Sequence, residues 1–181
     1  MKIPKRRFSA SVGRCVDKMN ICEPLAIKFA LGENPKSVYN DKSQSPATRM
    51  AVAAQIREIL YKAAEYMEQI NKANENDEED MPDFDIKLEA LLPLMRGKIP
   101  MHVHAHRADD IFTAIRISEE FELKIVLVHA TEGHLICDEL KEKNIPVLAG
   151  PILTDRSKPE LKNQSEINPA VLTAAGIKTA I

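Results

Sequence analysis

The chain has 181 residues, of which 44% are hydrophobic, and its 25 basic and 27 acidic side chains leave a formal net charge of −2. This size provides enough apolar material for one sizeable core, and the near-neutral charge gives no electrostatic reason to expect nucleic acid or an anionic membrane as a partner. Aromatic residues are scarce and tryptophan is absent, which argues against a stacking platform for single-stranded bases.

The cysteines and the N-terminus bear on the compartment. Cys15, Cys22 and Cys137 are odd in number and form no CxxC pair, which favours a reducing, cytoplasmic compartment over a disulfide framework. The basic N-terminus lacks the apolar region of a secretory signal. No apolar run approaches the roughly 20 residues that a membrane-spanning helix needs.

The first third of the chain predicts one strand and one long helix. Residues 1–23 show weak periodicity and are expected to form an irregular N-terminal segment. Residues 24–31 are expected to form a short buried strand with Lys28 in its middle, and the GENPK that follows is a turn signal.

The most regular helical pattern runs from Pro46 to about Asn74, where Ser45 is a suitable N-cap and Pro46 suits the first helical position. Apolar residues recur there at spacings of three and four: Met50, Ala53, Ile56, Leu60, Ala63, Met67 and Ile70. This pattern is typical of the core face of an amphipathic helix, and it favours packing over a cofactor role for the methionines.

An acidic stretch, residues 75–82, follows the long helix and is expected to be a solvated loop. A calcium site is the alternative, but the stretch lacks the alternating ligands and central glycine of an EF-hand loop. A second helix is predicted from Asp85 to Arg96, ending at Gly97.

From residue 99 onward, strands and helices alternate. Strands are predicted at 99–105, 124–129, 145–149 and 177–181, and helices at 108–121, 132–143 and 168–175. Such alternation predicts a parallel sheet with right-handed crossovers, either a (β/α) barrel or an open doubly wound sheet. No GxGxxG or GxxxxGK[ST] motif follows any strand, so the commonest nucleotide-binding sites of open sheets are missing.

All five histidines fall between positions 102 and 134. His102, His104 and His106 alternate at the end of one predicted strand, which places them on one face while the strand stays extended. His129 closes the next strand, and parallel α/β folds gather their ligands at this edge of the sheet. Neutral imidazole is a good ligand for zinc and similar ions, so a shared metal site stands against the alternative of separately hydrogen-bonded histidines.

Lys28 is the second unusual residue, because a lysine within an apolar strand is costly unless it is paired or modified. It either extends its ammonium group to the edge of the sheet or lies inside a barrel and approaches a metal.

The stretches IPMHVHAHRADDI (99–111) and KIVLVHATEGH (124–134) resemble imidazolonepropionase-related and prolidase-like members of the amidohydrolase superfamily. Three further segments fit the same group: 26–36, 45–50 and 176–181. The resemblance covers the chain from about residue 24 onward, and HAHR followed one helix later by VHATEGH is its most specific part. It implies an α/β fold of the metal-dependent hydrolase kind, a partial (β/α)8 TIM-type barrel with parallel strands and flanking helices.

The resemblance also implies a site. Matched by motif, Lys28 falls on barrel strand four, His104 on strand five and His129 on strand six, as ligands of one or two divalent ions. The resemblance makes zinc the expected ion, with iron, manganese and nickel open. In this family the strand-four lysine, which Lys28 matches, is often carbamylated. The residues implied on the substrate side are His106, Arg107, Glu132 and His134.

Two departures from the family pattern bear on activity. No separate HxH motif precedes the matched strands, and the aspartate expected on strand eight would follow Ile181. Residues 24–181 are therefore expected to form an incomplete barrel, about strands four to eight, with at most three of the family ligands. We expect the complete enzyme to hydrolyse an amide or cyclic amide through a metal-activated water, and this chain alone to be inactive.

The alternative is a non-catalytic α/β domain that oligomerises or binds a metal. An incomplete barrel exposes strand edges and apolar surface, both of which favour a homo-oligomer. The expected partner is a small-molecule amide, with no nucleic acid and no membrane. Cyclic amides, dipeptides, N-acyl amino acids and a deamination substrate all stay open, because loops set specificity in this fold.

Overall fold

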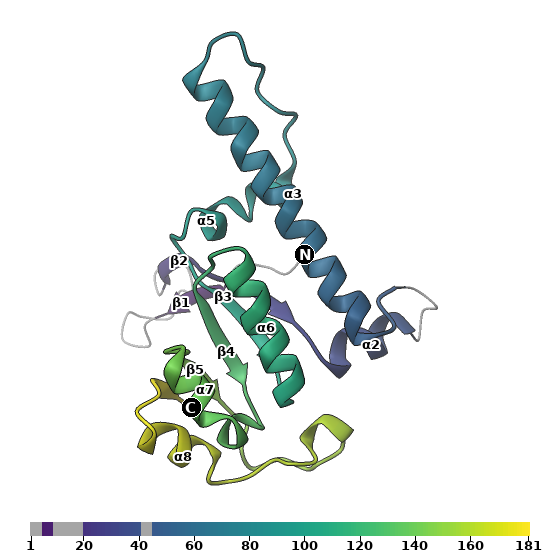
Figure 1. The fold of residues 1–181 in the computed structure, drawn as a ribbon, viewed down its shortest axis with the longest axis vertical. Helices are drawn as coiled ribbons and strands as arrows, with labels where there is room; N and C mark the ends of the chain where they lie inside the picture. The colour runs from purple at the N-terminus through teal and green to yellow at the C-terminus, as the bar shows by residue number, and fades with distance from the viewer. Residues whose placement is uncertain (1–4, 9–19, 41–44) are drawn as a thin grey trace.

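The computed structural model describes residues 5–8, 20–40 and 45–181. In these residues a six-stranded sheet carries helices along one side (Figure 1). The strands lie side by side in chain order: β1 (Lys5–Phe8), β2 (Asn20–Ala30), β3 (Met101–Ala105), β4 (Ile125–His129), β5 (Val147–Ala149) and β6 (Thr179–Ala180). β1 runs antiparallel to β2, and β2 to β6 are all parallel. The five parallel strands curl as half of a (β/α) barrel, which confirms the predicted fold class.

The helices alternate with these strands. They are α2 (Glu33–Asn40), α3 (Arg49–Glu75), α4 (Ile86–Glu89), α5 (Leu92–Met95), α6 (Ala108–Glu120), α7 (Cys137–Glu142) and α8 (Asn168–Ala174), with 3-10 turns η1 (Gly133–Leu135) and η2 (Pro159–Leu161). The helix predicted over 132–143 is thus divided between η1 and α7. In the described residues, no helix has the length and apolar character to cross a membrane.

The N-terminal part differs from the irregular segment expected over residues 1–23. β2 begins at Asn20, and residues 5–8 form β1 against it; residues 1–4 and 9–19 lie outside the described residues. The pairing joins Lys5 to Ala26 and Phe8 to Asn20. Backbone pairing between separated segments leaves no periodic signal in a short sequence, so the sequence could not predict it.

The turn expected at GENPK is confined to Gly32, whose φ is +82°, and α2 begins at the next residue, Glu33. The carboxylate of Glu160 accepts a hydrogen bond from the backbone N–H of Glu33 at 2.8 Å. A cap supplied from a distant part of the chain satisfies one of the orphan donors at a helix start, and local sequence gives no sign of it.

The long helix α3 begins three residues later than predicted. Thr48, and not Ser45, is the N-cap, and its hydroxyl accepts from the backbone N–H of Ala51 at 3.1 Å. The buried residues of α3 are Val52, Ala53, Ile56, Leu60, Ala63 and Tyr66. Met50 is 79% exposed. The predicted core face of the helix is therefore correct in its centre and wrong at its first residue.

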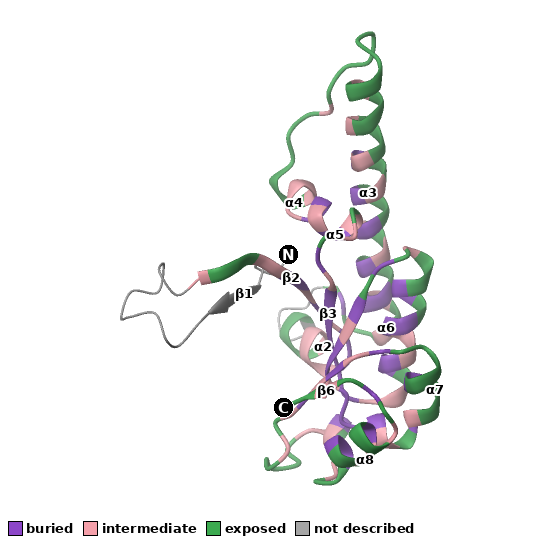
Figure 2. Ribbon diagram, turned by 90° about the vertical axis from the view of Figure 1, so that its left-hand side faces the viewer, coloured by how far each residue is buried: buried purple, intermediate pink, exposed green. Residues whose placement is uncertain are grey.

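The C-terminal half of α3 projects beyond the sheet, and the acidic segment after it is exposed as predicted (Figures 1 and 2). The single helix predicted from Asp85 to Arg96 is wrong, because the chain breaks it into α4 and α5. Pro93 explains the break, since a proline has no N–H to continue the helical hydrogen-bond ladder.

The core lies between the sheet and the helices that cover its convex face (Figure 2). Val103 of β3 and Leu127 of β4 meet Ile111 of α6 and Leu60 of α3 in one buried cluster. Because side chains alternate along a strand, the neighbours of Val103 on β3, which are histidines, face the other side of the sheet.

Candidate metal centre

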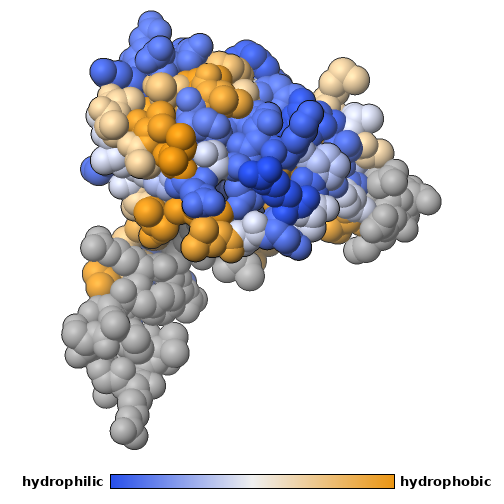
Figure 3. Space-filling view, turned by 90° about the horizontal axis from the view of Figure 1, so that it is seen from below, coloured by the Kyte–Doolittle hydropathy of each residue, from blue (hydrophilic) through white to orange (hydrophobic). Residues whose placement is uncertain are grey.

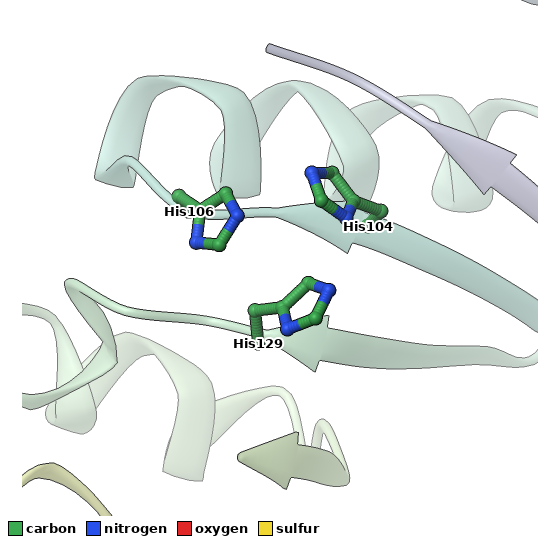
Figure 4. A group of neighbouring side chains, drawn as sticks. All are labelled: His104, His106 and His129. Atoms are coloured by element: carbon green, nitrogen blue, oxygen red, sulfur yellow. The ribbon is translucent and has the colours of Figure 1, made fainter. Parts of the chain in front are cut away.

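Three histidines meet at the carboxyl ends of two adjacent parallel strands (Figure 4). His104 lies on β3, His106 just beyond it, and His129 at the end of β4. One ring nitrogen of each lies within 4.8 Å of the others, and the ring centroids are 4.6 to 4.8 Å apart. His104 and His106 are buried and His129 is half-buried. We call these three residues the histidine triad.

The backbone at the end of β4 brings His129 into the triad. In the sheet register His129 pairs with Ala105, while His104 pairs with Val128. Regular alternation would therefore turn His129 to the face of Ala105, away from His104. Positive φ angles at His129 (78°) and Ala130 (42°) take the chain out of the extended conformation, and the ring lies beside His104 (Figure 4). Such unfavourable backbone angles cluster at functional sites.

Hydrogen bonds orient all three rings. Nδ1 of His129 donates to the carbonyl oxygen of Gly150, which leaves Nε2 as the unprotonated nitrogen of a neutral ring. Nδ1 of His106 lies 2.6 Å from the hydroxyl oxygen of Thr131. Nε2 of His104 lies 3.1 Å from the amide nitrogen of Asn34. The contact of His129, a ring N–H that donates to a backbone carbonyl, is typical of metal-binding histidines.

The electrostatics at His106 favour a neutral imidazole. Burial, with smaller contributions from the charges of His129 and Lys158, lowers the pKa of His106 to about 4. At pH 7 this ring therefore keeps a lone pair that a metal can use.

A buried carboxyl group, Glu160, lies next to the triad. Burial raises its pKa. Its Oε2 holds the Glu33 N–H, and its Oε1 lies 3.8 Å from Nε2 of His106. Within the described residues, Oε1 is buried without a hydrogen-bond partner. A buried acceptor in that state is costly, and it marks this edge of the sheet as polar and tightly enclosed.

The donor set fits a divalent transition metal. A tetrahedral zinc site with Zn–N bonds of about 2.0–2.1 Å separates its ligand nitrogens by about 3.3 Å. The triad nitrogens lie within 4.8 Å of one another, so modest side-chain rotations are enough to bring them to that spacing. The three histidines are therefore positioned to bind a metal ion. Imidazole alone does not select zinc over iron, manganese or nickel.

The structure brings together His104 and His129, two of the three predicted ligands, and adds His106, which the sequence placed on the substrate side. Lys28 lies elsewhere on β2. It pairs with His102, while Ala30 is the β2 residue level with His104. Lys28 is half-buried, and it is among the residues that line a cavity of 340 Å³ between β2 and the helices, together with Gln55 and Lys87. The metal role of Lys28 stays a prediction.

Two of the predicted substrate residues have partners in the start of α6. Arg107 forms an ion pair with Asp109 at 2.9 Å, which raises the pKa of the arginine and lowers the pKa of the aspartate. Glu132 accepts the backbone N–H of Ala108 at 2.7 Å and the amide of Asn163 at 2.8 Å. These contacts hold the helix start, and a substrate role for either residue stays a prediction.

His134, the last predicted substrate residue, lies in η1 and outside the triad. Its backbone N–H donates to Asn168 at 2.9 Å, and its half-buried ring presents a buried Nδ1 that has no partner among the described residues.

Sequence reasoning missed four residues that contact the triad, Asn34, Thr131, Gly150 and Glu160. It also missed Lys158, which donates to Asn34. Thr131 follows His129 by two positions, so its nearness was accessible from the sequence. Lys158 and Glu160 lie between β5 and α8, in a stretch without periodicity, and only the folded chain brings them to the site.

Comparison with known proteins gives two likenesses, while no family model matches the chain. The chain is 28% identical over 118 residues to the amidohydrolase tasK of Hapsidospora irregularis, and that alignment covers 61% of the chain and 12% of tasK. Its structure is similar to the crystal structure of an amidohydrolase from Thermotoga maritima MSB8, with a TM-score of 0.88 and 42% sequence identity.

The structural match covers 92% of this chain and 43% of the Thermotoga protein. The chain thus spans less than half the length of that relative and about an eighth of tasK. The curled parallel sheet matches a partial TIM-type amidohydrolase fold, and the two likenesses together support an amidohydrolase family for this chain.

Proposed function

We propose that this chain forms part of the active site of a metal-dependent amidohydrolase that cleaves an amide or cyclic amide C–N bond in a small molecule. The histidine triad at the carboxyl ends of β3 and β4 is the observation that carries the proposal. The two amidohydrolase likenesses support it. The motifs HAHR and VHATEGH favour the imidazolonepropionase-related, prolidase-like group within the family.

In this proposal His104 and His129 would hold the ion, with Lys28 as a third ligand. A divalent ion held by these residues would lower the pKa of a coordinated water toward 7 and so would supply a nucleophile at neutral pH. His106 lies in the same cluster, where its neutral ring can accept or position a proton. Arg107, Glu132 and His134 are the further residues that we assign to the substrate side.

We further propose that the site needs ligands beyond this chain. The Thermotoga relative is more than twice as long as the part that matches, and the family pattern includes a separate HxH pair before the matched strands and an aspartate on strand eight, neither of which is found in the 181 residues. We expect the reading frame around the coding sequence to encode an HxH strand upstream and an aspartate-bearing strand downstream. Finding neither would favour the non-catalytic alternative.

The metal site is tested by zinc titration of the purified chain against a chromophoric chelator. His104→Ala should weaken zinc binding at least tenfold, because an imidazole ligand is lost. His129→Asn should do the same while keeping a residue that tolerates the left-handed backbone. His134→Ala, a half-buried histidine outside the triad, is the matched control. Equal zinc binding by the wild type and His104→Ala would remove the basis of the proposal.

Activity is tested separately with cyclic amides, dipeptides and N-acyl amino acids in the presence of zinc. The chain alone should show little or no turnover, and a protein that includes both flanking regions should be active. Normal turnover by the 181-residue chain would show that the missing ligands are not needed.

We also propose that the chain associates with itself. Val126 and Leu148 are half-buried, and their sheet partners place them on the concave face with the histidines. Apolar patches also reach the surface among polar side chains in the view from below (Figure 3); exposed apolar residues near the C-terminus include Leu153, Ile167 and Ile181. Analytical ultracentrifugation over a range of concentrations tests this, and a monomer throughout would contradict it.

The remaining assignments are proposals of the same kind. Cys22 and Cys137 are unbonded thiols in the structure, which supports a reducing, cytoplasmic location. We expect no nucleic-acid partner and no membrane partner, since the chain carries a net charge of only −2. If zinc binds and the extended protein still lacks activity, a metal-binding or oligomerising α/β domain becomes the better assignment.

A further inference from the structure

His104 is connected to a lysine through one side-chain amide. Asn34, in the first turn of α2, is half-buried, and its Nδ2 lies 3.1 Å from Nε2 of His104. Its Oδ1 accepts a hydrogen bond from Nζ of Lys158, which comes from the segment between β5 and α8. The three side chains join parts of the chain that are 70 and 124 residues apart in sequence.

The polarity of these contacts is fixed by chemistry. A lysine ammonium donates only, so the Asn34 atom that faces Lys158 must be the oxygen. The other atom of the amide, which faces His104, is then the NH₂ group, and this group also donates only. Nε2 of His104 must therefore be the unprotonated, accepting nitrogen of the ring.

We propose that Lys158, acting through Asn34, is a positioning residue that opposes metal binding at His104. The inference rests on the proposed function, because it concerns the same site. Suppose first that Nε2 binds the metal. The lone pair that now accepts from Asn34 is then needed by the ion, so the amide must move away and its contact with Lys158 is lost.

The same conclusion holds if Nδ1 binds the metal. The ring proton then moves to Nε2, which becomes a donor facing the donating NH₂ group of Asn34. The amide must turn over to present its oxygen to His104, and its NH₂ group then faces the ammonium of Lys158. In either case the Lys158–Asn34 hydrogen bond breaks when the metal binds. The free energy of that hydrogen bond is then lost, which weakens metal binding by the same amount.

A direct charge effect must be separated from this mechanism. The ammonium of Lys158 is close enough to the triad to lower the pKa of His106, and a positive charge there also repels a divalent ion. A double-mutant cycle with Asn34 distinguishes the two, because repulsion by charge does not need the amide.

The experiment uses the full chain and four proteins: wild type, Lys158→Met, Asn34→Leu and the double variant. Zinc alone is the probe, with its dissociation constant measured by chelator competition. Lys158→Met should tighten zinc binding about three- to tenfold, the worth of one hydrogen bond. In the Asn34→Leu background the same change should have little effect. Lys162→Met removes an exposed lysine four positions away and should leave the constant unchanged.

A second measurement does not depend on a metal. Nitrogen-15 shifts of histidine rings report the tautomer, and in the presence of EDTA the wild type should show His104 with Nε2 unprotonated. Lys158→Met should allow the other tautomer to appear, and circular dichroism checks that each variant folds.

The outcomes separate the two proposals. If His104→Ala leaves zinc binding unchanged, the proposed metal site fails. If His104→Ala abolishes binding, and Lys158→Met either weakens it or tightens it equally with and without Asn34, the metal site stands and this inference is overturned. A protonated Nε2 in the wild type also overturns it.

Discussion

The convex face of the sheet and its carboxyl edge bury different kinds of side chain. The convex face meets α3 and α6 through aliphatic residues such as Leu60, Val103 and Leu127, all of them 0% exposed. The carboxyl edge instead buries polar groups: His104, His106, Asp110, Thr131, Glu160 and Asn168. Aliphatic burial stabilises a fold, whereas buried polar groups cost free energy unless they are paired. The difference indicates that the convex face sustains the fold, and it supports the proposal of a metal site at the carboxyl edge.

The largest expected effect tests the convex face. Leu60→Ala should lower the free energy of unfolding by about 2–5 kcal/mol, because the truncation leaves a cavity in a closely packed core. Chemical denaturation measures this, and Met50→Ala, at a residue that is 79% exposed, is the control. Zinc affinity of the folded variant should match the wild type. A parallel loss of zinc affinity would show that the two regions are not separable.

The carboxyl edge should respond to pH where the convex face does not. His106 takes up a proton near pH 6.5 in the unfolded chain but only at about pH 4 in the folded protein. Between these values the unfolded state binds more protons, so stability falls as the pH falls. With EDTA present, the loss from pH 7 to pH 4 should be roughly 2–3 kcal/mol. His106→Gln should flatten the dependence of stability on pH between pH 7 and pH 4. An unchanged dependence would show that His106 is not the group responsible.

Gly32 joins the two regions, since it lies two residues beyond the end of β2 and against the polar side chains of Glu160 and Asp110. Its φ is +82°, and a Cβ there would lie 2.6 Å from Oε2 of Glu160 and 3.2 Å from Oδ2 of Asp110. Gly32→Ala should therefore cost about 1–3 kcal/mol from the backbone alone and displace Glu160. Thermal unfolding measures the cost. Gly97→Ala, with a φ of +64° and open space around its Cβ, isolates the backbone contribution.

The smallest effect is expected at the projecting end of α3. Lys62 pairs with Glu58 at 2.6 Å and Lys72 pairs with Glu68 at 2.7 Å, all on the exposed surface. Lys62→Met and Lys72→Met should leave the melting temperature unchanged, because exposed ion pairs contribute little. A clear decrease would mean that this part of the helix has a structural role that burial does not show.

The sequence predicted the regular half of the fold and part of the site. Apart from the helix predicted over 132–143, which is divided between η1 and α7, the strands and helices from residue 99 onward were found within a few residues of their predicted bounds, because hydrophobic periodicity is a local signal. The sequence also placed His104 and His129 together, since parallel strands bring their carboxyl ends to one edge. The pairing of β1 with β2 and the start of α2 were missed, because both depend on partners that are distant along the chain.

The remaining contacts of the site depend on tertiary structure in the same way. Period two placed His102, His104 and His106 on one face but said nothing of His129, whose ring joins them only through a change of backbone conformation. Lys158 and Glu160 approach from a segment without periodicity. Such residues are identified only from the folded geometry and its hydrogen bonds, because their spacing in the sequence does not predict these contacts.

The left-handed backbone at His129 limits which amino acids can take its place. Among residues other than glycine, asparagine, aspartate and histidine occupy this conformation most readily, while β-branched side chains are strongly disfavoured. If the proposed metal site is correct, only a few amino acids can therefore be placed at position 129 to change its ion preference. Aspartate is the one that would replace the imidazole with a hard oxygen donor and still fit the left-handed backbone.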